Sequence, residues 1–104
     1  AGVEEAVAYV KQQNFTDVCV DSSIYYPQIL FFDQTPNDVY RDTVIYSNYP
    51  SAFLNVEQFG RFKFGLDYEN VPDHDAYIIR RDRGESFTEL GYVVVDFEQY
   101  SVAH

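Results

Sequence analysis

The sequence is short of cysteine and of positive charge. Its 104 residues include one cysteine, and seven lysines and arginines stand against seventeen aspartates and glutamates. The single cysteine, Cys19, excludes an intrachain disulfide and favours a reducing compartment. No apolar stretch is long enough for a membrane-spanning helix. The net charge of −10 opposes binding to nucleic acid and to anionic lipid, which both attract basic proteins. We therefore expect neither a nucleic acid nor a membrane as a partner.

The sequence also lacks the motifs that mark common cofactor and catalytic sites. Gly60 and Gly65 do not have the spacing of a nucleotide-binding loop, so we interpret them as a bend or bulge in a strand. Cys19 and His74 could act as nucleophile and base only if the fold brought them together. Cys19 lies in an apolar, strand-like stretch, where a thiol behaves as a small buried hydrophobe and where neighbouring carboxylates would raise its pKa. We expect no cofactor and no catalytic residue.

Aromatic residues are abundant instead. The chain has ten tyrosines and nine phenylalanines but no tryptophan and no methionine. Aromatic and β-branched side chains pack well on the pleated surface of a sheet, so this composition favours strands. The length suits one domain, residues 1–104, which can bury a core without disulfide or metal staples.

Residues 3–13 predict a helix. Val3, Val7 and Val10 recur at three- and four-residue spacing and make one apolar stripe. Acidic residues lie in the first turn and Lys11 lies in the last, where the helix dipole favours each sign of charge.

The rest of the chain predicts strands with short connections. We expect strands at 15–21, 28–34, 39–47, 59–68, 76–81 and 92–100, and we leave 52–58 open between strand and helix. A turn at 35–38 would join the second and third strands as a hairpin, and the capping pattern at 86–89 predicts one helical turn, ended by Gly91. Short connections require antiparallel pairing. The sequence thus predicts an α+β fold in which a short N-terminal helix packs on a curved, mostly antiparallel sheet of six or seven strands.

Residues 67–75 predict an acidic loop. Its carboxylates could supply oxygen ligands to a hard cation such as calcium, and they are Asp67, Glu69, Asp73 and Asp75. The spacing does not match the helix–loop–helix calcium loop, because Pro72 stands where that loop needs glycine. We favour a loop whose charges face water, so these four residues are only weak candidates for a metal site. His74 is expected to be an exposed loop histidine, because it lacks the companions of a zinc ligand.

Five of the seven basic residues lie between positions 61 and 83. Arg80, Arg81 and Arg83 crowd a predicted hairpin tip, where their guanidinium groups could bind a carboxylate or a phosphate. The alternative is charge balance against the acidic remainder of the domain, and we favour it because exposed ion pairs are common and weak.

Tyrosines cluster between positions 25 and 50. A core of this size cannot easily supply a hydrogen-bond partner to ten tyrosine hydroxyls, so some of them should be exposed. Exposed tyrosines make contact surfaces for proteins and for sugars, and they also line sheet edges without any binding role. The candidate binding residues of this kind are Tyr25, Tyr26, Tyr40, Tyr46 and Tyr49.

Three classes of function fit these observations. The first is a non-enzymatic protein-interaction domain that uses an acidic, tyrosine-rich surface, with a partner that is basic or a second copy of the chain. Examples are an inhibitor, an immunity-type protein, or a subunit of a larger assembly such as a viral particle. The second is a module that binds carbohydrate or another small ligand. The third is a small enzyme that uses a pair of carboxylates in a sheet-lined pocket. The first is the leading hypothesis.

Overall fold

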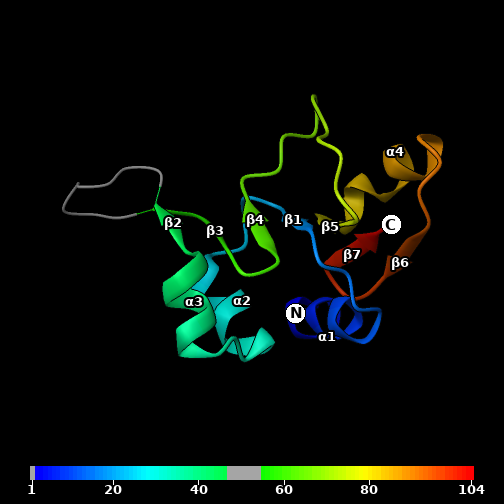
Figure 1. The fold of residues 1–104 in the computed structure, drawn as a ribbon. Helices are drawn as coiled ribbons and strands as arrows, with labels where there is room; N and C mark the ends of the chain where they lie inside the picture. Colours follow the sequence, from blue (N-terminus) through cyan, green and yellow to red (C-terminus); the bar gives the residue numbers. More distant parts are fainter. Residues whose placement is uncertain (1, 47–54) are drawn as a thin grey trace.

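The computed structural model describes residues 2–46 and 55–104, which form a seven-stranded sheet with helices on both sides (Figure 1). The helices in these ranges are α1 (Val3–Gln12), α2 (Tyr26–Asp33), α3 (Asn37–Thr43), the 3₁₀ helix η1 (Arg81–Arg83) and α4 (Gly84–Glu89). The strands are β1 (Val18–Val20), β2 (Ile45–Tyr46), β3 (Val56–Phe59), β4 (Phe62–Phe64), β5 (Ala76–Arg80), β6 (Val94–Asp96) and β7 (Tyr100–Ala103).

The strands lie in the order β2-β3-β4-β1-β5-β7-β6. The central strand β1 runs parallel to both of its neighbours, β4 and β5. The other four pairings are antiparallel. The prediction of an α+β fold with a mostly antiparallel sheet is therefore confirmed, and the two parallel pairings at its centre were not predicted.

The sheet buries a different apolar cluster on each face. On one face, Val18 and Val20 of β1 pack with the buried stripe of α1 and with Ile29 of α2. On the other face, Cys19 packs with Tyr77 of β5 and with Phe87 of α4. In Figure 1, α1, α2 and α3 lie below the strands, whereas α4 lies above them. The strand predicted at 15–21 is therefore present but shorter, as β1, and both of its faces are buried.

The strand predicted at 28–34 is wrong, because this segment is α2. Pro27 lies in the first turn of the helix, where its missing N–H costs nothing, and Gln34 ends the helix with a left-handed backbone. The apolar run that indicated a buried strand is buried on one side only, since Ile29 is fully buried and Phe31 is exposed.

The predicted hairpin of 28–34 and 39–47 is wrong for the same reason. Pro36 is the N-cap residue of helix α3, and within the described part of 39–47 the strand is limited to Ile45 and Tyr46, as β2. Within the ambiguous segment 52–58, the described part begins a strand at Val56.

Two segments that were predicted as single strands contain turns. The segment 59–68 turns at Gly60, whose positive φ of 53° suits the tight connection from β3 to β4. The segment 92–100, predicted as one strand, folds into β6, a turn at 97–99 and the start of β7, and Val93 before β6 is exposed. Helix α4 begins at Gly84, two residues before the predicted capping box, and ends before Gly91 as predicted.

Candidate functional site

Three of the candidate tyrosines come together. Burial raises the pKa of Tyr40, and the nearby side chains of Tyr46 and Tyr26 raise it further. The ring of Tyr40 also packs on Phe59, with ring centroids 5.3 Å apart. The three tyrosines come from α2, α3 and β2, and all three pack against the main apolar cluster. Tyr49 lies outside the described residues.

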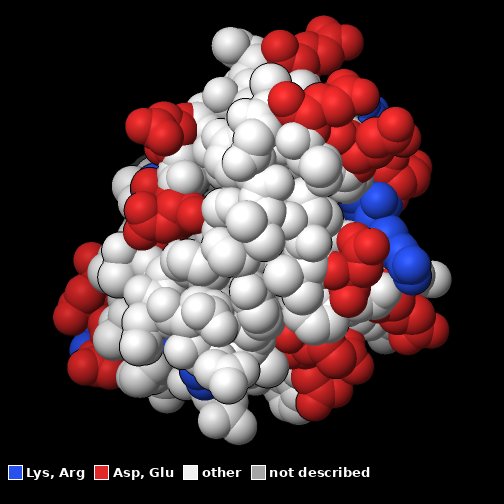
Figure 2. Space-filling view, turned by 90° about the vertical axis from the view of Figure 1, so that its right-hand side faces the viewer, with Lys and Arg blue, Asp and Glu red and all other residues white. Residues whose placement is uncertain are grey.

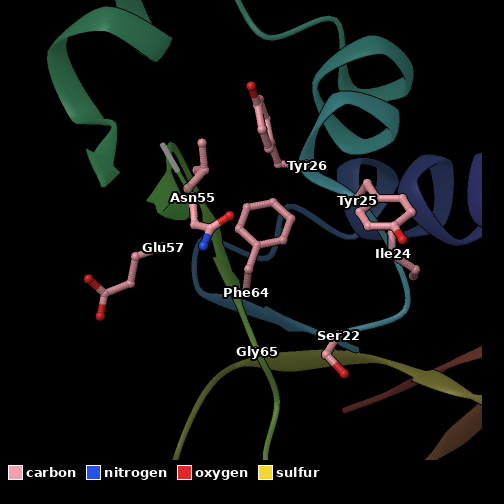
Figure 3. Close-up of a pocket in the computed structure, with 9 residues that line it drawn as sticks. Ser22, Ile24, Tyr25, Tyr26, Asn55, Glu57, Phe64 and Gly65 are labelled. Atoms are coloured by element: carbon pink, nitrogen blue, oxygen red, sulfur yellow. The ribbon is translucent and has the colours of Figure 1, made fainter. Parts of the chain in front are cut away.

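A hollow of about 500 Å³ opens beside this group, beyond the ends of β1 and β4 (Figure 3). Tyr25, Tyr26 and Phe64 supply its aromatic wall, and Ser22 and Gly65 lie where the chain leaves the two strands. The remaining lining residues are Ile24, Asn55, Val56 and Glu57. Figure 3 shows the Glu57 carboxylate pointing away from the three rings. The hollow therefore offers flat apolar surfaces to a ligand.

Asp21, directly after β1, belongs to a hydrogen-bond network that the sequence analysis missed. The carboxylate is only 2% exposed, and it accepts bonds from the Tyr68 hydroxyl and from the backbone and hydroxyl of Ser23. Burial by itself would raise the pKa of Asp21, but these bonds and the nearby Arg80 outweigh it and hold the pKa below 3.8. A carboxyl group that stays ionised in this way does not serve as a general acid near neutral pH. The signal in the sequence was an aspartate at the end of a buried strand.

The three candidate arginines contact residues of their own domain. Arg80 Nε lies 3.3 Å from Asp82 Oδ1, and Arg81 Nε lies 3.9 Å from Asp96 Oδ2. The guanidinium carbon of Arg83 lies 4.5 Å from the centre of the Tyr68 ring, a cation–π contact. The predicted hairpin tip is instead the η1–α4 segment.

His74 of the acidic loop contacts Asp17, the residue directly before β1. Its Nδ1 is hydrogen-bonded to Asp17 Oδ1 at 2.7 Å, and Lys63 Nζ donates to the same oxygen at 2.6 Å. The expectation of an exposed His74 is wrong, since its side chain is only 12% exposed. Burial would raise the pKa of Asp17, but Lys63 and His74 outweigh it and lower the pKa.

The weak metal candidates do not assemble into a ligand set. Within 2–46 and 55–104, no group of three or more histidine, cysteine, aspartate or glutamate side chains could hold a metal ion. Asp67 bonds to the backbone of its own loop at Glu69, and Asp75 bonds to Thr16. None of the described helices has the length and apolar character needed to cross a membrane.

Cys19 and His74 do not form a nucleophile and base. Cys19 is buried between β4 and β5, and burial, with a contribution from Asp17, raises the pKa of its thiol to about 11. His74 directs its Nδ1 to Asp17. A thiol that stays protonated at neutral pH is a poor nucleophile.

The surface around α4, β6 and the C terminus has few charges at its centre. Figure 2 looks onto this side and shows a broad area without lysine, arginine, aspartate or glutamate, bordered mainly by acidic side chains. On the elements of this side, Leu90 directly after α4 and Val93 directly before β6 are 64% and 58% exposed. We call this side of the molecule the uncharged face, and its exposed large apolar residues are Leu90 and Val93.

Comparisons with protein-family models, with curated proteins and with solved structures find no match to this chain. An argument about function therefore depends on the surfaces and pockets described above.

Proposed function

We propose that the chain is a non-enzymatic protein-interaction domain that binds a partner through the uncharged face. The observation that carries this proposal is a broad area without charged side chains inside a mainly acidic border (Figure 2), on the side whose elements also carry the exposed Leu90 and Val93. Interfaces commonly have a core poor in charge and a polar rim, and a contiguous apolar area of this kind is a frequent mark of a binding site. The inhibitor, immunity-type and assembly-subunit forms of the proposal differ in the partner and share this surface.

The charge favours a basic partner over a second copy. Each chain carries a net charge of −10, so two copies repel each other, whereas a basic partner is attracted and its association is accelerated. Added salt should weaken capture of such a partner because it screens the acidic border.

Capture by an immobilised domain tests the proposal. We expect the affinity for a protein captured by the wild type to fall at least about tenfold when Leu90 and Val93 are both replaced by aspartate. Both changes would bury a charge in the contact. Phe31→Asp is the matched control, since Phe31 is also an exposed apolar residue but lies in α2. The captured protein is then purified and its affinity for the three forms is measured. Equal affinity for all three forms, or no capture at all, would overturn the proposal.

A second candidate function is the binding of a flat or ring-shaped small ligand, such as a sugar, in the hollow of Figure 3. The observation that favours it is the wall of Tyr25, Tyr26 and Phe64. Tyr25→Ala should abolish binding of soluble oligosaccharides on an array, and Phe31→Ala should preserve it. The two side chains are equally exposed, at 75%, and Phe31 does not line the hollow. A lack of binding to any sugar by the wild type would rule out this ligand class.

A further inference from the structure

Strand β6 is one edge of the sheet, and its hydrogen-bond pattern shows which backbone groups face outward. Val93 exchanges both backbone bonds with His104 of the neighbouring segment, and the Phe97 N–H donates to the Tyr100 carbonyl. Bonded and non-bonded pairs alternate along an antiparallel ladder. Val95, opposite Val102, therefore also faces β7 with its backbone groups.

The backbone groups of Val94 and Asp96 consequently point away from the sheet. The described residues provide no backbone partner for their N–H and C=O groups beyond the edge. An extended stretch from Val93 to Phe97 thus presents two donors and two acceptors in a row. Such a row is a template for an added strand.

The residues on the two faces of β6 leave its edge accessible and determine which side chains an added strand would contact. Helix α4 covers one face of β6, where Gly84 approaches the side chain of Val94. On the opposite face, Val93 and Val95 alternate with the covered residues, and Val93 is exposed. A strand added here would find apolar neighbours on the side of Val93 and Val95.

Carboxylates lie around this edge. Asp96 is at its C-terminal end, and Glu85 and Glu89 are exposed on the neighbouring helix α4. Arg81 offsets part of this charge, because its Nε lies 3.9 Å from Asp96 Oδ2. The carboxylates still outnumber this arginine, so they complement basic residues at the ends of an incoming segment.

We propose that β6 binds an extended segment of the partner by strand addition, and that this segment has alternating apolar residues with lysine or arginine at its ends. The inference rests on the proposed function and gives its mode of binding. The backbone bonds supply affinity, and the acidic residues select the basic flanks. A second copy of the chain is disfavoured as occupant, because each copy carries a net charge of −10 and the two repel each other.

A synthetic peptide tests this mode directly. The probe is a fluorescent peptide of alternating valine and threonine with two lysines at each end, and its control carries glutamates in place of the lysines. We expect saturable binding of the lysine peptide by fluorescence anisotropy and at least about tenfold weaker binding of the glutamate peptide. Hydrogen exchange of the Val94 and Asp96 amides should slow on binding, because these are the donors that an added strand would use.

Two variants at one position separate the backbone from the side chain. Val94→Pro removes an outward N–H without removing a bond to β7, and proline is tolerated on an edge strand. It should raise the Kd by about tenfold or more, since it removes a backbone bond and hinders the approach of the peptide. Val94→Thr keeps the N–H and should change the Kd by less than about twofold. The melting temperature of each variant verifies that it folds.

The outcomes distinguish this inference from the proposed function. Binding that Val94→Pro does not weaken, or binding without protection of the two amides, overturns strand addition. Protection of these amides in the free protein that grows with protein concentration identifies a second copy as the occupant and also overturns it. If a captured partner is lost by the Leu90 and Val93 aspartate variant but kept by Val94→Pro, the proposed function stands and strand addition fails.

Discussion

The two carboxylates at the ends of β1 are stabilised in different ways. Asp17, before the strand, is 31% exposed and is bonded to two basic side chains, Lys63 and His74. Asp21, after the strand, is almost fully buried, and its hydrogen-bond donors are the neutral Tyr68 hydroxyl and the groups of Ser23. Both pKa values lie below the ordinary value of 3.8.

The difference shows that a lowered pKa does not identify the kind of stabilisation. At Asp17 one partner is the Lys63 ammonium, in a half-exposed ion pair, and such pairs are weak and screened by salt. At Asp21 the interactions are fixed hydrogen bonds in a buried site, where the loss of one partner leaves polar groups unsatisfied. The two ends of β1 should therefore respond very differently to the same substitution.

The largest effect is expected at Asp21. Asp21→Ala should lower the free energy of unfolding by about 2–4 kcal/mol, because it removes a buried acceptor and leaves the hydroxyl of Tyr68 without its carboxylate. Urea unfolding followed by circular dichroism measures this. The control is Asp73→Ala in the acidic loop, whose exposed side chain should change stability by less than about 0.5 kcal/mol. A similar loss in both variants would remove the contrast between buried and exposed carboxylates.

Tyr68→Phe should cost about 1–2 kcal/mol of unfolding free energy. The Tyr68 hydroxyl donates to Asp21 and accepts the N–H of Arg80, and both bonds are lost while the ring keeps its contact with Arg83. Tyr25→Phe provides the comparison, since Tyr25 is exposed and should lose little. Urea unfolding followed by circular dichroism measures both losses. An unchanged midpoint for Tyr68→Phe would show that the hydroxyl adds no net stability.

Acid should destabilise the domain through both aspartates. Each has a lower pKa in the folded state than in the unfolded state, so the folded state binds fewer protons. This stability is present above the unfolded pKa of about 3.9 and is lost as the pH falls through the folded values. The urea midpoint should decrease as the pH is lowered from about 7 to about 3, mainly below the unfolded pKa. The decrease should be smaller in Asp21→Asn. NMR titration of the two carboxyl carbons would contradict the prediction if either pKa exceeded 3.8.

The smallest effect is expected at Asp17. Asp17→Asn should cost at most about 1 kcal/mol at low salt, and the cost should shrink further in about 1 M salt. The loss in Asp21→Asn should persist at the same salt concentration, because buried hydrogen bonds are screened much less. Unfolding curves at two salt concentrations test this, and equal salt dependence of the two variants would show that both ends of β1 depend on ion pairing.

The sequence predicted the parts of the fold in which local pattern and burial agree. The stripe of Val3, Val7 and Val10 became the buried face of α1, and the mostly apolar segment 76–80 became β5. The segment 29–32 failed because four consecutive apolar residues do not distinguish a buried strand from a helix. Pro27 and Pro36 are compatible with helix starts, but the sequence alone did not distinguish a helix start from a turn at these positions.

The site was less predictable, because it depends on residues far apart in the chain. The pairing of Asp17 with Lys63 and His74, and that of Asp21 with Tyr68, needs the parallel arrangement of β1 with β4 and β5. Short connections indicated antiparallel neighbours, so no spacing in the sequence could place these partners together. The grouping of Tyr26, Tyr40 and Tyr46 followed from two helices that were predicted as strands.

The placement of β1 between two later strands also governs how the chain folds. Val18 pairs with Phe62 on one side and with Ala76 on the other, so the centre of the sheet is completed only after β5 has been synthesised. Forming such distant pairings requires closing long loops, which slows folding relative to a protein of local contacts. Until β4 and β5 arrive, the valines of β1 have no sheet partners, and a nascent chain that ends before residue 76 leaves the first strand unpaired on at least one side.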